Sequence, residues 1–245
     1  MKKTIIALMA LAGVAVGEMY TVTPLTESTG WTDVSLRNRA TWTHVDGTLT
    51  LDNSNWGQAV STYDLSTDIA APLSFSFELA RGTSSAGVSI TFIGLDKAVS
   101  IGTKDYTSGE MFYGTTDTLD AASYSLNTAW DQGTTVTATS LLGDALNYNA
   151  TATVTGITSV NADGDTILTL NASSTATANT GTATVNLGKD FVLDKIVFCG
   201  DGPNNATGIW TFKNVSVTAV PEPTTATLSL LALAGLAARR RRASR

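Results

Sequence analysis

The sequence has very few of the residues on which most catalytic and metal sites depend. Its 245 residues include one histidine, His44, and one cysteine, Cys199. A single cysteine excludes an internal disulfide, and a single histidine excludes a histidine-rich metal site. A Ser-His-Asp or Cys-His arrangement would have to use His44, which stands near Trp42 on an alternating segment typical of a surface or pocket residue. Cys199 follows an apolar run that indicates a buried, structural thiol.

Basic residues are scarce between the two ends of the chain. Residues 18–219 hold eight of the 15 Lys and Arg residues and 20 of the 21 Asp and Glu residues, which gives this region a net charge of −12. Such a charge repels nucleic acid and anionic polymers and argues against a phosphate-backbone binder. The same charge attracts cations such as Ca²⁺.

Sustained helical periodicity is absent from residues 19–219, where short alternating runs are broken by Gly, Asn, Asp and Ser. Two such runs flank Asp46 and Gly47, a strong signal for a β-hairpin. A strictly alternating run, 73–79, places its Leu and Phe residues on one face. We expect an all-β, jelly-roll-like two-sheet sandwich in a single domain, 18–219, with further strands at 88–92, 98–101, 111–113, 151–160, 166–170, 182–187, 191–198 and 209–217.

The N-terminus has the layout of a secretory signal peptide, which we assign to residues 1–17. Two lysines precede an apolar run over 5–16, and Ala15 and Gly17 are the small residues that a signal peptidase requires. The expected cleavage therefore falls between Gly17 and Glu18. The alternative is an N-terminal anchor that is never cleaved.

The C-terminal segment, 220–245, has three blocks: Pro221, Glu222 and Pro223; a charge-free run over 224–238; and Arg239, Arg240, Arg241 and Arg242. As a helix the run would span about 22 Å, which is shorter than the ~30 Å hydrocarbon core of a bilayer. The arginines should stay on the cytoplasmic side as a basic stop. The alternative is a soluble C-terminal helix with a basic end.

These three blocks, in this order, resemble the PEP-CTERM sorting tail of diderm bacteria. The resemblance implies export, transient anchoring in the inner membrane by a hydrophobic helix, and cutting near Pro221–Pro223 by an exosortase, a membrane-embedded protease or transpeptidase. Release to the outer surface or the extracellular matrix would follow. The implied partners are the exosortase and signal peptidase, together with an exopolysaccharide of the matrix.

The central region resembles the concanavalin A-like, or laminin-G-like, jelly roll. The resemblance depends on Trp31 and Trp42 near the start, the Phe-x-Phe strand at 75–77, and a closing strand at 209–217. In that fold the closing strand pairs beside an early strand, and here it leads directly into the tail.

Candidate ligand-binding residues are few. Trp56 and Trp130 stand in turn-rich sequence and are candidates for stacking on sugar rings, whereas Trp210 suits a core position. Asn161, Asp163 and Asp165 occupy alternate positions, as in Ca²⁺ loops, and form the one weak metal candidate. The glycine and glutamate that complete such loops are missing, so an ordinary turn is preferred, and no cofactor is expected.

Two further functions have weaker signals. Laminarinase-type enzymes of the same jelly roll place paired carboxylates on one strand, but Glu78 and Glu110 are each isolated. Alternating threonines resemble ice-binding surfaces, although threonine also fills the wet face of many sheets. We therefore prefer a non-catalytic protein delivered to the envelope or matrix. A carbohydrate-binding module is the alternative, with a glycan hydrolase or an ice-binding protein less favoured.

The signal-peptide layout predicts that the mature protein begins at Glu18. N-terminal sequencing of protein recovered from the cell surface should return Glu18 followed by Met19. A sequence that begins at Met1 or Lys2 would contradict this prediction.

Overall fold

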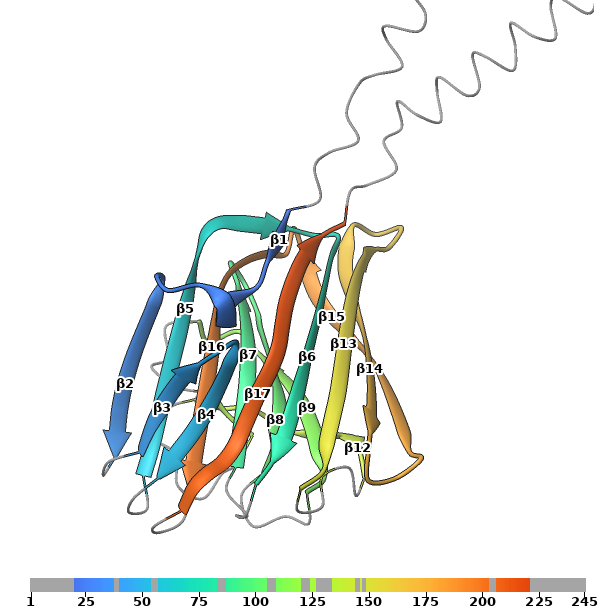
Figure 1. Ribbon diagram of the computed structural model, residues 1–245. Coiled ribbons are helices and arrows are strands. Elements are labelled where there is room, and N and C mark those ends of the chain that lie inside the picture. Colours follow the sequence, from blue (N-terminus) through green and yellow to red (C-terminus); the bar gives the residue numbers. More distant parts are fainter. Residues whose placement is uncertain are drawn as a thin grey trace, which may run out of the picture. The chain divides into compact units, whose positions relative to one another are not determined.

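Two antiparallel β-sheets lie face to face in the computed structural model (Figure 1). Residues 21–219 form one compact unit by their contacts. The structure describes the following residues: 20–37, 40–53, 57–82, 87–104, 109–119, 124–126, 134–143, 146, 149–202 and 206–220.

The sheet that faces the viewer in Figure 1, called sheet A, contains both the first and the last strand of the unit. A two-residue strand, β1 (Thr21–Val22), pairs with β17. In order across the sheet, the other strands are β15 (Thr180–Lys189), β14 (Asp165–Ser174), β13 (Thr151–Val160), β6 (Leu73–Arg81), β17 (Ala206–Ala219), β4 (Thr48–Asn53) and β3 (Ala40–Val45).

Sheet B lies behind sheet A in Figure 1. Across it, the strands are β12 (Thr139–Leu142), β9 (Met111–Thr116), β8 (Ala98–Thr103), β7 (Gly87–Gly94), β16 (Val192–Gly202), β5 (Gly57–Ala70) and β2 (Trp31–Arg37). A short 3₁₀ helix, η1 (Pro24–Thr26), and a parallel pair, β10 (Tyr124–Ser125) with β11 (Thr134–Thr135), complete the described elements.

The predicted strands are present. Asp46 and Gly47 join β3 to β4, and both have positive φ, 47° and 73°. Positive φ at both central residues is the geometry of a type I′ hairpin turn. The predicted hairpin between 151–160 and 166–170 is formed by β13 and β14. The closing strand, β17, lies between β4 and β6, as the jelly-roll resemblance implied.

The core between the sheets is rich in aromatic rings. Phe75 of β6 stacks on Phe92 of β7 with ring centroids 4.1 Å apart. Phe212 of β17 meets Phe198 of β16 edge-to-face at 5.1 Å. Trp210 is 1% exposed, which confirms its expected core position. Because strand side chains alternate between faces, the inward phenylalanines of β6 and β17 have polar neighbours on the outer face of sheet A.

The centre of sheet B, at β7 and β8, is buried on its outer face as well. The sequence of β7 alternates, yet all eight of its residues are buried. Tyr124, Leu126 and Val136 pack against this face in a second apolar cluster, in which Tyr124 is fully buried. The backbone N–H of Tyr124 donates to Cys199 Sγ at 3.2 Å, which agrees with a structural thiol. The alternation of apolar residues along a strand cannot show that its outer face is also buried, when the residues that bury it come from a distant part of the chain.

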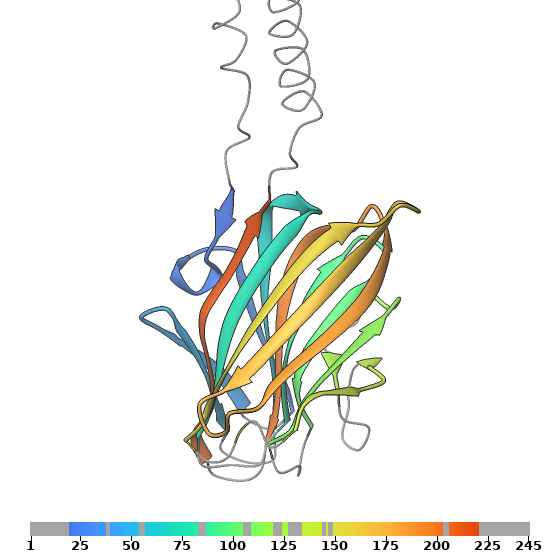
Figure 2. The ribbon, with the colours of Figure 1, turned by 90° about the vertical axis from the view of Figure 1, so that its right-hand side faces the viewer.

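Figure 2 views the molecule from the side on which β13, β14 and β15 lie. In this part of sheet A, Gly156 of β13 gives room to the Phe75 ring, because a Cβ on Gly156 would overlap three atoms of that ring.

Gly156→Ala should therefore destabilise the domain by about 1–3 kcal/mol through overpacking. For a domain of this size, each kcal/mol lowers the melting temperature by roughly 2–4 °C. Gly143→Ala is the matched control, since a Cβ there would have no atom within 4 Å. Thermal unfolding followed by circular dichroism measures both variants. Equal melting temperatures for the two would contradict the packing described here.

Candidate functional site

The outer face of sheet A is covered with small polar side chains. In β6 the inward residues are buried and the outward ones, Ser74, Ser76 and Glu78, are half-buried. The strand register aligns such positions in rows. One row runs from β17 to β15 and contains, in order, Ser216, Ser76, Thr155, Asn171 and Thr182. Hydroxyl and amide groups therefore follow one another directly across five strands.

A bulge in β17 interrupts this face. Lys213 pairs with Glu78 and Ser216 pairs with Ser76, so two residues of β17 oppose one residue of β6. Asn214, in the bulge, has φ 52°, and its Nδ2 donates to Glu78 Oε1 at 2.9 Å. A bulge bends its strand and increases the local twist. Next to the bulge, on the side toward the C-terminal end of β17, the outer surface of sheet A is hollowed.

Two hollows meet at Ser76 and Ser216, where their hydroxyls lie 2.9 Å apart. The first has a volume of about 270 Å³, and Ile157 and Asn171 stand on its far side. The second has a volume of about 510 Å³ and is bounded by η1 and by the β3–β4 turn at Asp46. We call the two hollows together the serine trough. Ligand pockets typically have volumes of 300–1,000 Å³, so the trough is large enough for a small ligand or a short segment of a polymer.

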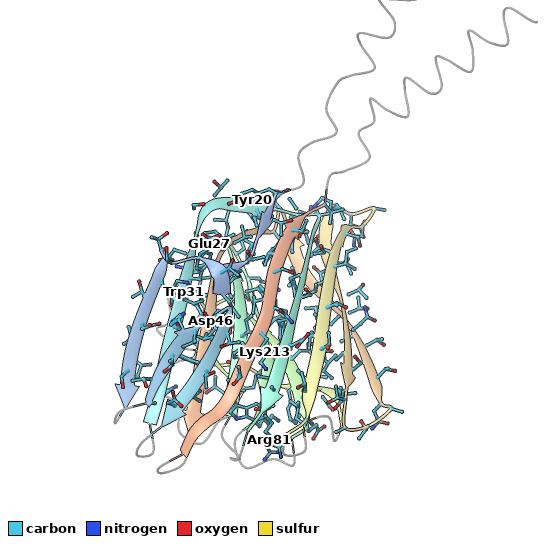
Figure 3. The ribbon with its side chains drawn as sticks, viewed as in Figure 1. Tyr20, Glu27, Trp31, Asp46, Arg81 and Lys213 are labelled. Atoms are coloured by element: carbon cyan, nitrogen blue, oxygen red, sulfur yellow. The ribbon has the colours of Figure 1, made fainter. Side chains whose placement is uncertain are left out.

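The serine trough has little net charge, although the region 18–219 is strongly acidic. Among the described outward side chains of β6, β13 and β17, the charged ones are Glu78 and Lys213, which are partners in the register. Asp46 adds one carboxylate at the rim. Asp46 and Lys213 are labelled on this face in Figure 3. Such a surface favours an uncharged, hydroxyl-bearing ligand over an ionic one.

His44 lies in a polar cluster at the edge where β2 and β3 bring the sheets together. Its Nε2 is 3.2 Å from Asp33 Oδ2 and 3.3 Å from Ser61 Oγ. Ser61, which is fully buried, donates its hydroxyl proton to Asp33 Oδ1. Trp31 meets the His44 ring edge-to-face at 4.4 Å. The cluster closes one end of the aromatic core with hydrogen-bonded polar groups.

This cluster contains the residue types of a catalytic triad but not its geometry. In a triad the acid holds Nδ1 of the histidine, so that Nε2 is free to take the serine proton. Here Asp33 and Ser61 both approach Nε2, and the serine proton is directed to the carboxylate. The sequence could not indicate this cluster, because Asp33 and Ser61 are brought to His44 by pairing between different strands.

The predicted calcium candidate forms a hydrogen-bonded turn. Asn161 Oδ1 accepts the backbone N–H groups of Asp163 and Asp165, at 3.0 and 2.8 Å. Asp165 Oδ2 accepts a hydrogen bond from Asn186 at 3.1 Å. One side-chain oxygen of Asn161 and one of Asp165 therefore already accept hydrogen bonds within the protein. Across the described residues, no three His, Cys, Asp or Glu side chains lie together in a way that could hold a metal ion.

Several predicted site residues lie outside the described residues, and the predictions about them stand as made. They are the signal-cleavage residues Ala15, Gly17 and Glu18; the glycan-stacking candidates Trp56 and Trp130; the sorting motif Pro221, Glu222 and Pro223; and the basic stop Arg239–Arg242. Within the described ranges, no helix has the length and apolar character needed to cross a bilayer.

Comparison with known proteins gives one sequence match. Residues 219–242 match the PEP-CTERM protein-sorting motif. No curated protein matches the sequence.

Solved structures align with the chain at low identity. The CBM2 module of the evolved Dit protein from Lactobacillus casei BL23 phage J-1 aligns with a TM-score of 0.48 and 10% identity, over 83% of this chain and 95% of that one. A lectin from Bauhinia forficata in complex with GalNAc gives 0.46 and 12%, over 82% and 96%. Alginate lyase vAL-1 from Chlorella virus gives 0.40 and 12%, over 78% and 93%.

The described strands define the class of the folded unit, a jelly-roll-like sandwich of two antiparallel sheets. The PEP-CTERM match begins at Ala219, the last residue of β17. The chain is an exported protein with a PEP-CTERM sorting motif, which passes through the membrane and is processed by an exosortase.

The turn at Asn161–Asp165 predicts that stability does not depend on calcium, because hydrogen bonds within the protein, accepted by Asn161 Oδ1 and Asp165 Oδ2, already hold the turn. A cation bound at a hundred times its dissociation constant would add about 2.7 kcal/mol, or several degrees in melting temperature. We expect millimolar Ca²⁺ and chelator to give the same melting temperature. A rise on adding Ca²⁺ that disappears in Asp163→Ala would show that the turn is a metal site.

Proposed function

We propose that the mature protein is a non-catalytic component of the outer surface or extracellular matrix, and that its sandwich binds a neutral glycan in the serine trough. The observation that carries this proposal is the pair of hollows that meet at Ser76 and Ser216 on the outer face of sheet A. The sorting motif supports the destination. A glycan of the matrix would then retain the protein after its tail is removed.

The groups in the trough suit sugar hydroxyls. Serine and threonine hydroxyls both donate and accept hydrogen bonds, and asparagine amides do the same with separate atoms. Ser74, Ser76, Thr155 and Asn171 line the first hollow. Each such hydrogen bond contributes about 0.5–1.5 kcal/mol net, so binding requires several bonds along a chain of sugars. Ile157, which is 50% exposed, offers an apolar contact at the rim.

The acidic groups near the trough favour binding without catalysis. Glu78 accepts a hydrogen bond from Asn214, and Asp46 occupies a hairpin turn at the rim. A glycosidase needs two carboxylates that flank one bond, and a triad hydrolase needs the histidine geometry that the Asp33 cluster lacks. The bulge also bends β17 and increases the local twist of this face, which favours a glycan over the flat surface of an ice crystal.

The trough can be tested with an array of neutral and uronic-acid oligosaccharides, followed by calorimetry on the neutral glycan that binds most strongly. Ser76→Gln places a longer side chain in the middle of the trough and leaves the core untouched, since Ser76 points outward. We expect it to weaken binding at least about tenfold, which corresponds to about 1.4 kcal/mol.

Thr184→Gln is the matched control, because Thr184 lies on the same face, on β15, and outside both hollows. It should bind as the wild type does. Equal binding by the wild type and Ser76→Gln would move the site elsewhere. Activity on a glycan, measured as new reducing ends or unsaturated products, would overturn the non-catalytic part of the proposal.

A further inference from the structure

The segment that leads into the sorting tail is part of sheet A. The last strand, β17, ends at Ala219, and the sorting match begins at the same residue. Residues 217–219 pair with residues 75–73 of β6. The sorting match therefore overlaps the last residue of the folded sheet. We call residues 217–219 the stem of the tail.

The other edge of the stem is occupied by β1. Thr21 pairs with Thr218 and Val22 pairs with Val217. The two threonine hydroxyls lie 3.0 Å apart, and Val22 and Val217 are both buried. Figure 1 shows β1 beside the end of β17. The stem is consequently held from both sides, by β6 and by β1.

These two partners differ in strength. The β6 strand has nine residues and lies inside the sheet, whereas β1 has two residues and lies at its margin. After β1 the chain continues through η1, where Pro24 is buried and Leu25 packs against the core. Short marginal elements open at much lower free-energy cost than central strands. Of the two partners, β1 is the one that can leave while the sandwich stays folded.

A protease that recognises a segment binds it in extended form, and an exposed strand edge provides the backbone groups for such binding. Both edges of residues 217 and 218 are taken while β1 is paired. We propose that β1 is a clamp on the sorting tail: its pairing with Val217 and Thr218 limits access of the sorting enzyme to the segment beyond Ala219, and its release starts processing. This proposal uses the sorting motif and is independent of the glycan site.

A removable cross-link between β1 and the stem tests the clamp. Thr21 and Thr218 are directly opposite in antiparallel strands, where Cα atoms lie about 4.5–5.5 Å apart, within the range of disulfides. Thr21→Cys with Thr218→Cys should form a disulfide in the oxidising exported compartment. Cys199 is 3% exposed and is a poor competitor for either cysteine.

The full chain would be produced in cells that contain the sorting enzyme, and C-terminal mass spectrometry would follow tail removal over time. Because processing requires the open form, the cross-linked protein should lose its tail at least about tenfold more slowly than the wild type. Reductant should restore the wild-type rate. Each single cysteine variant should be processed normally and melt at the wild-type temperature.

A spacer separates loss of access from misfolding. About eight Gly and Ser residues inserted after Ala219 would place the motif roughly 25 Å of extended chain beyond the sheet. The cross-linked protein with this spacer should be processed at the wild-type rate, because the enzyme no longer needs the stem. Wild-type processing of the cross-linked chain without a spacer would overturn the clamp, and so would failure of the spacer to restore processing.

Discussion

Burial of aromatic rings between the two sheets is the interaction on which the rest of this structure depends. Phe75 and Phe77 of β6 point inward together with Phe212 of β17, and they meet Phe92 and Phe198 of the other sheet. Truncating one such ring to alanine typically costs about 3–5 kcal/mol, a large part of the stability of a domain. Since side chains alternate along a strand, fixing Phe75 and Phe77 inward fixes Ser74 and Ser76 outward. Ser216 points outward because the bulge at Asn214 reverses the alternation of β17 after inward Phe212. Core packing therefore also sets the β6 side of the serine trough, and the bulge sets its β17 side.

The closing strand, β17, connects the core, the trough and the tail. Its inward residues fill the core, its bulge at Asn214 shapes the trough, and its last residues lead into the sorting motif. The centre of sheet B is covered on its outer face by Tyr124, Leu126 and Val136. The outer face of sheet A, by contrast, carries the rows of small polar side chains. The surface that we propose for glycan binding thus includes the strand that leads into the sorting motif.

Much of the fold could be predicted from local sequence. Asp46-Gly47 specifies its hairpin because only a few residue types tolerate positive φ at both positions. The alternation at 73–79 specifies the inward face of β6 because the period of a strand is two. The proposed binding site could not be predicted in this way. Tryptophans in turn-rich sequence were the available signal for glycan binding, whereas the trough is made from ordinary serines, which are also common on wet sheet faces.

The sequence by itself determined the all-β class, the hairpins, the inward face of β6 and the sorting motif, because each depends on residues that are close together in the chain. Only the tertiary structure decided which strands became neighbours. Pairing between distant strands brought Ser76 beside Ser216, Asp33 and Ser61 to His44, and β1 to the stem of the tail. These contacts depend on the register between strands, which is set by how all the inward side chains fit together in one core.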